Sequence, residues 1–133
     1  MLKILMVDDS KTILRVLKNV LTRMLDKDTV FLEAYNGEEA LNVVEENNDI
    51  DIILLDVNMP IMTGDKFLEI FRSNKDNNKV KVVMVTTEAE KKTVIKIMKL
   101  GANGFIVKPF TPEILRKSLD PILRRLGVDL KEV

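Results

Sequence analysis

Polar residues that directly follow short apolar runs are the part of this sequence best suited to chemistry. Asp8 and Asp9 follow the first run, Asp56 the third, Thr86 the fourth and Lys108 the fifth. Carboxylates bind hard cations such as Mg²⁺, and a carboxylate is also a nucleophile that forms acyl phosphates. A lysine adds a point charge that neutralises a phosphoryl oxygen. These residue types predict a magnesium-assisted phosphoryl site.

Each residue has a predicted role in such a site. Asp56 is the best nucleophile, because no other group in the sequence is activated. Asp8 and Asp9 are expected to hold the metal, directly or through water, while the metal and Lys108 offset the charge of the phosphoryl group. The plainer interpretation is that strand-end Asp residues cap helices, and capping by Asp9 or Ser10 is compatible with metal binding.

Composition excludes several other chemistries. The 133 residues include no His and no Cys, which removes disulfides, imidazole bases, thiol nucleophiles and the usual zinc, haem and iron–sulfur ligands. Basic and acidic residues number 21 each, so the neutral chain has no electrostatic footprint for nucleic acid. No apolar run approaches the roughly 20 residues that span a bilayer. We expect a cytoplasmic protein with no membrane or nucleic-acid partner.

The elements that must position these residues are indicated by hydrophobic patterning. Nearly continuous runs rich in Val, Ile and Leu are typical of parallel strands buried on both faces. Five such strands are predicted, at 4–7, 30–34, 52–55, 80–85 and 105–107. Stretches with apolar spacings of three and four alternate with them and predict five helices. Strict alternation favours an α/β fold, a doubly wound five-stranded parallel sheet of (βα)5 flavodoxin-like topology.

Turn signals refine this prediction. Asn36-Gly37 marks a strand-to-helix join, Gly101 fits the end of the fourth helix, and Thr111-Pro112-Glu113 is typical of a helix start. The polar segment 73–79 is expected to be a surface loop. Pro121 lies within the last helical pattern and should kink or interrupt that helix.

The proposed site follows from this topology. The carboxyl ends of parallel strands share one edge of the sheet, so the polar groups after the first, third, fourth and fifth strands should meet in one crevice. Three carboxylates gathered there repel one another, and a divalent cation removes that repulsion.

The motifs at these strand ends resemble the receiver domain of bacterial two-component response regulators. The resemblance covers roughly residues 2–127 and rests on four segments in order, VDDS, DVNMPIMTG, MVTTEAE and GFIVKPF. It is strongest to the single-domain, CheY-like regulators of chemotaxis.

The resemblance implies a role for each matching residue. Asp56 would accept a phosphoryl group from a histidine kinase, and Asp8 and Asp9 would bind Mg²⁺. Asn58 matches the residue whose backbone carbonyl completes the metal shell. Thr86 matches the hydroxyl residue that moves to the phosphoryl group.

The remaining matches concern the fifth strand and the lifetime of the acyl phosphate. Lys108 matches the family's lysine, and the Lys108–Pro109 bond its cis peptide. Phe105 stands where the chemotaxis proteins usually carry Tyr as the switch aromatic, and a simple core role for Phe105 stays open. Asn58 and Glu88 occupy the positions that tune hydrolysis of the acyl phosphate.

The predicted function is therefore that of a response regulator. We expect residues 1–133 to form a single receiver domain with no output domain, a monomer whose fourth helix, fifth strand and fifth helix bind a target such as a flagellar motor switch. Such a protein is a phosphoacceptor with autophosphorylation and autodephosphorylation activity, not an enzyme with external turnover. A phosphorelay intermediate, a phosphate sink and a fragment of a larger regulator are alternatives.

Two other classes of protein fit the sequence less well. A haloacid-dehalogenase-like phosphatase also uses an aspartyl phosphate and magnesium, but it needs a second Asp where this sequence has Asn58. A flavodoxin-like cofactor module would place phosphate at the first loop, where Asp8 and Asp9 would repel it.

Overall fold

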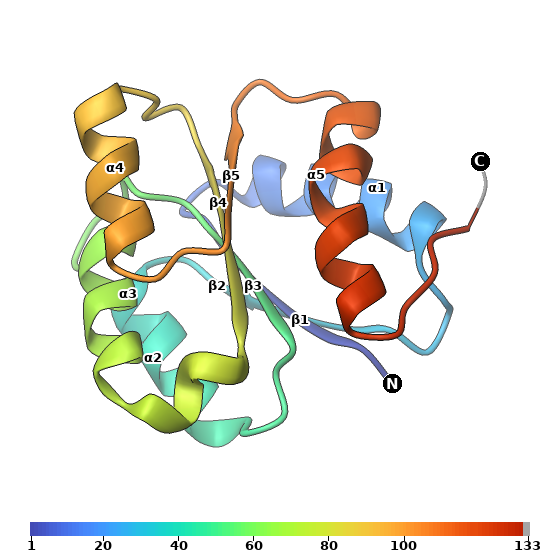
Figure 1. The fold of residues 1–133 in the computed structure, drawn as a ribbon, viewed down its shortest axis with the longest axis horizontal. Helices are drawn as coiled ribbons and strands as arrows, with labels where there is room; N and C mark the ends of the chain where they lie inside the picture. Colours follow the sequence, from blue (N-terminus) through green and yellow to red (C-terminus); the bar gives the residue numbers. More distant parts are fainter. Residues whose placement is uncertain (132–133) are drawn as a thin grey trace.

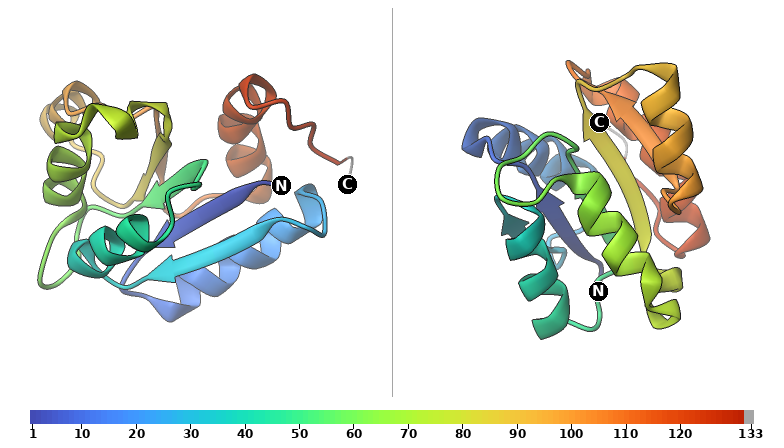
Figure 2. Two further views of the ribbon diagram at one scale, coloured as in Figure 1. Left: turned by 90° about the horizontal axis from the view of Figure 1, so that it is seen from below. Right: turned by 90° about the vertical axis from the view of Figure 1, so that its left-hand side faces the viewer.

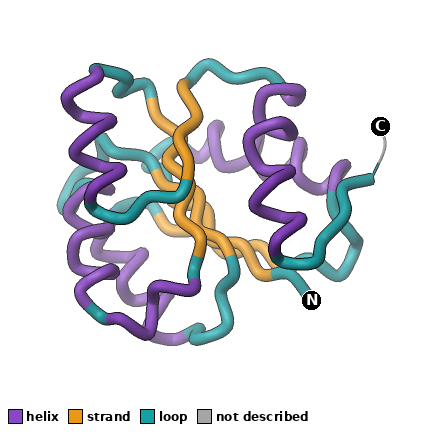
Figure 3. Tube along the Cα trace, viewed as in Figure 1, coloured by secondary structure: helices purple, strands orange, loops and turns teal. Residues whose placement is uncertain are grey.

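A computed structural model describes residues 1–131 and contains one parallel sheet whose strands alternate with helices along the chain (Figure 3). The strand order is β2-β1-β3-β4-β5, which confirms the predicted doubly wound topology. The strands are β1 (Lys3–Val7), β2 (Val30–Ala34), β3 (Ile52–Leu55), β4 (Lys81–Thr86) and β5 (Gly104–Val107), and the α-helices are α1 (Lys11–Met24), α2 (Gly37–Glu46), α3 (Gly64–Ser73), α4 (Lys91–Lys99) and α5 (Pro112–Arg125).

The helices form a layer on each face of the sheet. Helices α1 and α5 cover one face, and α2, α3 and α4 cover the other (Figure 1; Figure 2). Alternate residues of each strand therefore enter one of two cores: Leu5 and Val7 of β1 join the α2–α3–α4 side, whereas Ile4 and Met6 join the α1–α5 side. Burial on both faces explains why the strand sequences show continuous apolar runs instead of alternation.

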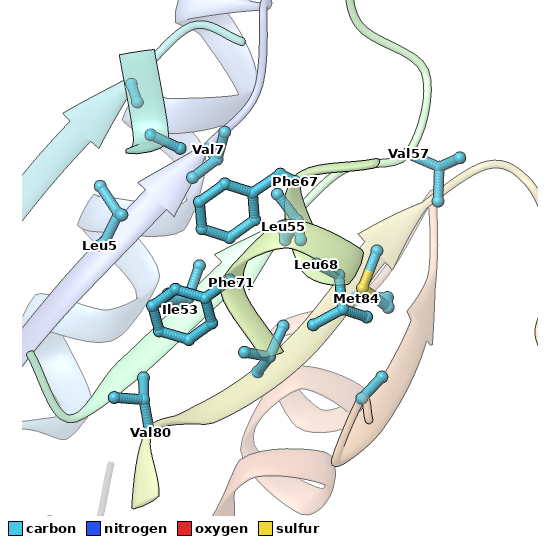
Figure 4. Packing of buried hydrophobic residues seen from close by; sticks show 14 of the residues in the cluster. Leu5, Val7, Ile53, Leu55, Val57, Phe67, Leu68, Phe71, Val80 and Met84 are labelled. Carbon is cyan, nitrogen blue, oxygen red and sulfur yellow. The ribbon is translucent and has the colours of Figure 1, made fainter. Parts of the chain in front are cut away.

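The core beneath α3 is centred on two aromatic rings. Phe67 and Phe71 lie one helical turn apart and stack with their ring centroids 5.3 Å apart. Figure 4 shows both rings lying over the strands, close to Ile53 and Leu55 of β3. This packing fixes α3, and with it the loop that joins β3 to α3.

Helix ends follow the predicted cap chemistry. The side chains of Ser10, Asn36 and Thr111 each accept a hydrogen bond from the backbone N–H three residues on, at 3.3, 2.9 and 3.1 Å. Gly101 follows the C-cap of α4 with φ +107°, a conformation that favours glycine. Ser10 is the N-cap of α1, so Asp9 does not cap this helix.

The structure differs from two local predictions, that of a surface loop over residues 73–79 and that of an interruption at Pro121. Residues 75–79 are not an irregular loop but a short 3₁₀ helix, η1 (Lys75–Lys79), because the side chain of Asn74 accepts a hydrogen bond from the Asp76 N–H at 3.0 Å and begins a turn. Pro121 does not interrupt α5, which runs from Pro112 to Arg125. Pro121 is exposed, and Leu119 and Leu123 beside it are buried, so the packing of the buried face holds the helix despite the lost hydrogen bond.

Gly64 fits the start of α3 against the end of β3. A Cβ atom at this position would overlap the backbone carbonyl oxygen of Asp56. The Gly64 N–H also donates to the carbonyl of Val57 at 2.9 Å. The close approach therefore closes the loop that follows Asp56.

We predict that Gly64→Ala lowers the free energy of unfolding by about 3 kcal/mol or more, the upper end for overpacking, because the new methyl group meets backbone that cannot rotate away. Gly127→Ala is the matched control, since Gly127 has φ +77° and open space around it; it should cost only the left-handed strain of about 1–2 kcal/mol. Urea unfolding measures both, and equal losses would contradict the clash.

Candidate functional site

Neighbouring strands bring two aspartates side by side. Val7 and Leu55 are partners in the β1–β3 register, so Asp8 and Asp56 are the next residues on each strand. The Asp56 N–H donates to the carbonyl of Val7 at 3.0 Å, which continues the ladder to the sheet edge. One carboxylate oxygen from each of Asp8, Asp9 and Asp56 lies within 4.8 Å of the others. The structure thus brings together the three acids that the sequence singled out.

Backbone amides orient the two buried carboxylates. Asp8 Oδ1 accepts from the Ser10 N–H at 2.9 Å, and Asp56 Oδ1 accepts from the Val57 N–H at 2.8 Å. Asp8 and Asp56 are only 2% and 5% exposed, whereas Asp9 is exposed. In each buried carboxylate one oxygen is held by the backbone, and the second faces the shared space.

Lys108 occupies that shared space. Its Nζ atom lies 2.9 Å from Asp8 Oδ2 and 3.3 Å from Asp56 Oδ2. The Lys108 N–H donates to the carbonyl of Thr86 at 2.9 Å, so β4 positions the lysine beyond the end of β5. Burial would lower the pKa of Lys108, but the hydrogen bond to Asp8 and the attraction of Asp56 outweigh burial and raise it. The ammonium group therefore stays charged at neutral pH.

Thr86 links the site to the face covered by α4. Its side chain is fully buried, and its hydroxyl accepts from the Glu88 N–H at 3.1 Å. In the β4–β5 register Thr86 pairs with Val107 and Met84 with Phe105, so these four side chains lie on one face of the sheet. Phe105 is half-buried against the core on this side. A movement of the Thr86 hydroxyl would therefore occur on the same face as the predicted switch aromatic.

Two glycines hold the loop that follows Asp56, residues 57–63. Gly64 closes it onto Val57, as described above, and the Gly37 N–H donates to the carbonyl of Met62 at 2.9 Å. A Cβ atom on Gly37 would lie 2.7 Å from Met62 Cγ and 2.9 Å from that carbonyl oxygen. The turn between β2 and α2 is thereby packed against the loop without room for a side chain.

Ile61 at the tip of this loop has a strained backbone. Its φ is +69°, and the Met62 N–H donates back to the Pro60 carbonyl at 2.7 Å, which makes Ile61 the centre of a γ-turn of the rare, strained kind. The left-handed region costs about 1–2 kcal/mol for a residue with a Cβ atom. The side chain is nevertheless 77% exposed. This conformation is not predictable from residue type, because β-branched residues avoid it.

The remaining predicted residues lie around the same edge. The Lys108–Pro109 peptide bond is cis. Asn58 is exposed at the start of the loop, and Glu88 is half-buried at the start of the segment between β4 and α4. The role of the Asn58 carbonyl as a metal ligand remains a prediction. The roles of the Asn58 and Glu88 side chains in tuning hydrolysis of the acyl phosphate also remain predictions.

The acidic cluster suits a hard divalent cation. Its donors are all carboxylate oxygens, the ligand type that Mg²⁺ prefers. Asp9 offers an exposed carboxylate, and the backbone amides fix the buried oxygens of Asp8 and Asp56 before any ion binds. Asp8, Asp9 and Asp56 are therefore the residues able to hold such an ion.

Comparisons with known proteins agree with this geometry. Residues 4–120 match the family model of the response regulator receiver domain. The chain is 42% identical to a chemotaxis protein CheY homolog of Campylobacter jejuni, covering 92% of each chain, and 40% identical to chemotaxis protein CheY1 of Helicobacter pylori, covering 92% of this chain and 97% of that one. Among solved structures, chemotaxis protein CheY4 of Vibrio cholerae superposes with a TM-score of 0.81 at 36% identity, covering 92% of this chain and 99% of that one. Within residues 1–131, no helix has the length and apolar character needed to cross a membrane.

We predict that Lys108→Met, which keeps the side-chain length but removes the charge, lowers the free energy of unfolding by about 3 kcal/mol in metal-free buffer, because it leaves buried Asp8 and Asp56 without a cation. The pKa of Lys108 is raised above its ordinary 10.5. The difference in the free energy of unfolding between wild type and Lys108→Met should therefore be constant between pH 7 and 10 and shrink only at higher pH.

Urea unfolding in the presence of a chelator measures this effect. Asp49→Asn is the control, because it breaks the Lys3–Asp49 ion pair, whose carboxylate side chain is 60% exposed, and exposed pairs contribute little. A Lys108→Met protein as stable as wild type would show that the ammonium group does not stabilise the carboxylates.

Proposed function

The chain belongs to the family of response regulator receiver domains, and from that premise we propose that Asp56 accepts a phosphoryl group from a phosphohistidine of a histidine kinase. As a response regulator the protein transduces a signal and does not turn over an external substrate. One observation carries the proposal: Asp8, Asp9 and Asp56 present carboxylate oxygens within 4.8 Å of one another, and Lys108 Nζ lies 3.3 Å from the proposed acceptor.

The transfer is a nucleophilic displacement at phosphorus. An oxygen of the Asp56 carboxylate forms the new O–P bond while the N–P bond of the donor breaks, and the imidazole leaves with the electron pair and takes up a proton. The backbone N–H of Val57 holds Asp56 Oδ1 at 2.8 Å, so the oxygen on the Lys108 side is the one available to attack. Lys108 then neutralises negative charge on the incoming phosphoryl oxygens.

A magnesium ion completes the proposed site. Asp8 and Asp9 would hold it together with Asp56 and the backbone carbonyl of Asn58, and the ion would supply positive charge that the three carboxylates and the phosphoryl group require. The same site accounts for the proposed autophosphorylation with small phosphodonors and for autodephosphorylation, whose rate Asn58 and Glu88 would tune.

Thr86 is the proposed sensor of the phosphoryl group. Its hydroxyl would leave the Glu88 N–H and donate to a phosphoryl oxygen, which changes the space beneath α4 and the position of Phe105. A hydrogen bond to a charged group contributes roughly 1.5–3 kcal/mol. Converting a population from 1:99 to 99:1 requires about 5.5 kcal/mol, so the metal, Lys108 or the target must supply the rest.

The proposed output surface is formed by α4, β5 and α5. It carries four partly exposed apolar side chains, those of Ile95, Met98, Val107 and Ile114, at 41–48% exposure. Helix α4 also contains four lysines and no acidic residue, so an apolar segment with acidic neighbours is the complementary target. By analogy with the chemotaxis relatives, we infer that this target is a component of chemotaxis control such as a flagellar motor switch.

The lifetime of the phosphoryl group separates the possible outputs. Loss within seconds to minutes favours chemotaxis or a phosphate sink, whereas a stable aspartyl phosphate favours a phosphorelay intermediate. Radiolabel decay after removal of the phosphodonor measures this lifetime directly.

We predict that acetyl phosphate and Mg²⁺ add one phosphoryl group to the wild-type chain and none to Asp56→Asn, because an amide is not a nucleophile toward phosphorus. A chelator should also abolish the addition. Asp51→Asn is the control, since Asp51 lies at the opposite end of β3 and accepts a hydrogen bond from the Lys3 N–H. Intact-mass spectrometry reads out all samples, and modification of Asp56→Asn, or none of the wild type, would overturn the proposal.

We predict that Thr86→Ala is still phosphorylated but loses roughly tenfold or more of the phosphorylation-dependent gain in target affinity, the equivalent of a charge-assisted hydrogen bond. Thr86→Ser keeps the hydroxyl and should retain most of the gain. Titration of the target with and without beryllofluoride measures the gain for each variant. An unchanged response in Thr86→Ala would contradict the proposed sensor.

A further inference from the structure

Ile61 has two features that do not stabilise the isolated, folded chain. Its backbone is held in the left-handed region, and its apolar side chain is 77% exposed, almost as much as that of the N-terminal Met1. Glycine or asparagine would adopt the same backbone with less strain. Burial within the chain does not offset the strain, because the side chain points to solvent.

The loop presents this side chain rigidly. Val57 is tied to Gly64, and Met62 is tied to Gly37, each by a backbone hydrogen bond of 2.9 Å. Both glycines leave no space for the loop to relax inward, since a Cβ atom on Gly37 would lie 2.7 Å from Met62 Cγ. Ile61 is thus an exposed apolar side chain in a hydrogen-bonded loop that begins directly after Asp56.

We propose that Ile61 is a docking residue for the protein that donates the phosphoryl group, contacting an apolar surface beside the donor's phosphohistidine. The proposal rests on the function proposed for Asp56. It concerns a different surface from the output face, whose apolar residues lie on α4, β5 and α5.

The position of the loop places this contact within reach of a protein donor. Ile61 is three residues from Gly64, which limits their Cα separation to about 11 Å. Gly64 itself is bonded to Val57, the neighbour of Asp56. A typical interface covers about 800 Å² on each partner, a disc of roughly 16 Å radius. An interface of this size, formed by a protein that places its phosphohistidine in line with Asp56, can therefore extend to Ile61.

A small phosphodonor provides the contrast. Acetyl phosphate carries no protein surface that could pack against the Ile61 side chain. Loss of the isoleucine should therefore affect transfer from a protein and leave transfer from acetyl phosphate unchanged.

The experiment compares both donors on Ile61→Asn, which suits a left-handed backbone and should not lower the thermal midpoint. The protein donor is a purified, phosphate-loaded histidine kinase selected because it phosphorylates the wild-type chain. We expect kcat/KM with the kinase to fall about tenfold, or about 1.4 kcal/mol, and the acetyl phosphate rate to stay the same. Ile70→Asn, the same change at an exposed isoleucine of α3 (38% exposed), should alter neither rate.

Two results would overturn the docking role while leaving the proposed function intact. An unchanged kinase rate in Ile61→Asn would show that the side chain makes no productive contact. Equal losses with both donors would show that Ile61 shapes the site instead. A wild-type chain that accepts phosphate neither from acetyl phosphate nor from any histidine kinase screened as the donor would overturn the function of Asp56 and the docking role together.

Discussion

The ammonium group of Lys108 between the carboxylates of Asp8 and Asp56 is the interaction on which the site depends. Two buried carboxylates at adjacent strand ends repel each other, and the lysine, at 2.9 and 3.3 Å, is the positive charge that offsets this repulsion. With Asp9 the cluster still carries three negative charges against one positive charge. That remaining negative charge favours a divalent cation, and the same lysine is in place to meet a phosphoryl group.

The parallel sheet creates this arrangement, and close backbone packing refines it. Adjacent parallel strands end at the same edge of the sheet. The register of β1 and β3 therefore places Asp8 beside Asp56, and it does not require any contact between the two carboxylates. The loop beyond Asp56 is then shaped by two positions that admit only glycine, Gly64 against Asp56 and Gly37 against Met62. Strain at Ile61 persists because these contacts and the stacked rings of Phe67 and Phe71 hold both ends of the loop.

Much of this could be predicted from sequence because it depends on patterns. The continuous apolar runs, the caps at Ser10 and Thr111 and the acids after the strands each reflect a local rule, and together they predicted the topology and the crevice. Prediction failed where tertiary packing overrides a local rule. Pro121 lies inside an intact helix because the buried face of α5 holds it. The conformation of Ile61 could not be foreseen, because the contacts that hold its loop, of Gly37 with Met62 and of Gly64 with Asp56, form only in the folded chain.

The contact made by Thr86 would limit how far the proposed phosphorylation alone could shift the protein. In this structure the hydroxyl already accepts a hydrogen bond from the Glu88 N–H, and moving it to a phosphoryl oxygen gives that bond up. A neutral hydrogen bond contributes about 0.5–1.5 kcal/mol and one to a charged group about 1.5–3 kcal/mol, so the exchange gains about 1–2 kcal/mol. Nearly complete conversion needs about 5.5 kcal/mol. The difference must come from interactions formed only in the other state, and the partly exposed apolar residues of α4, β5 and α5 are the groups in which a bound target could supply it.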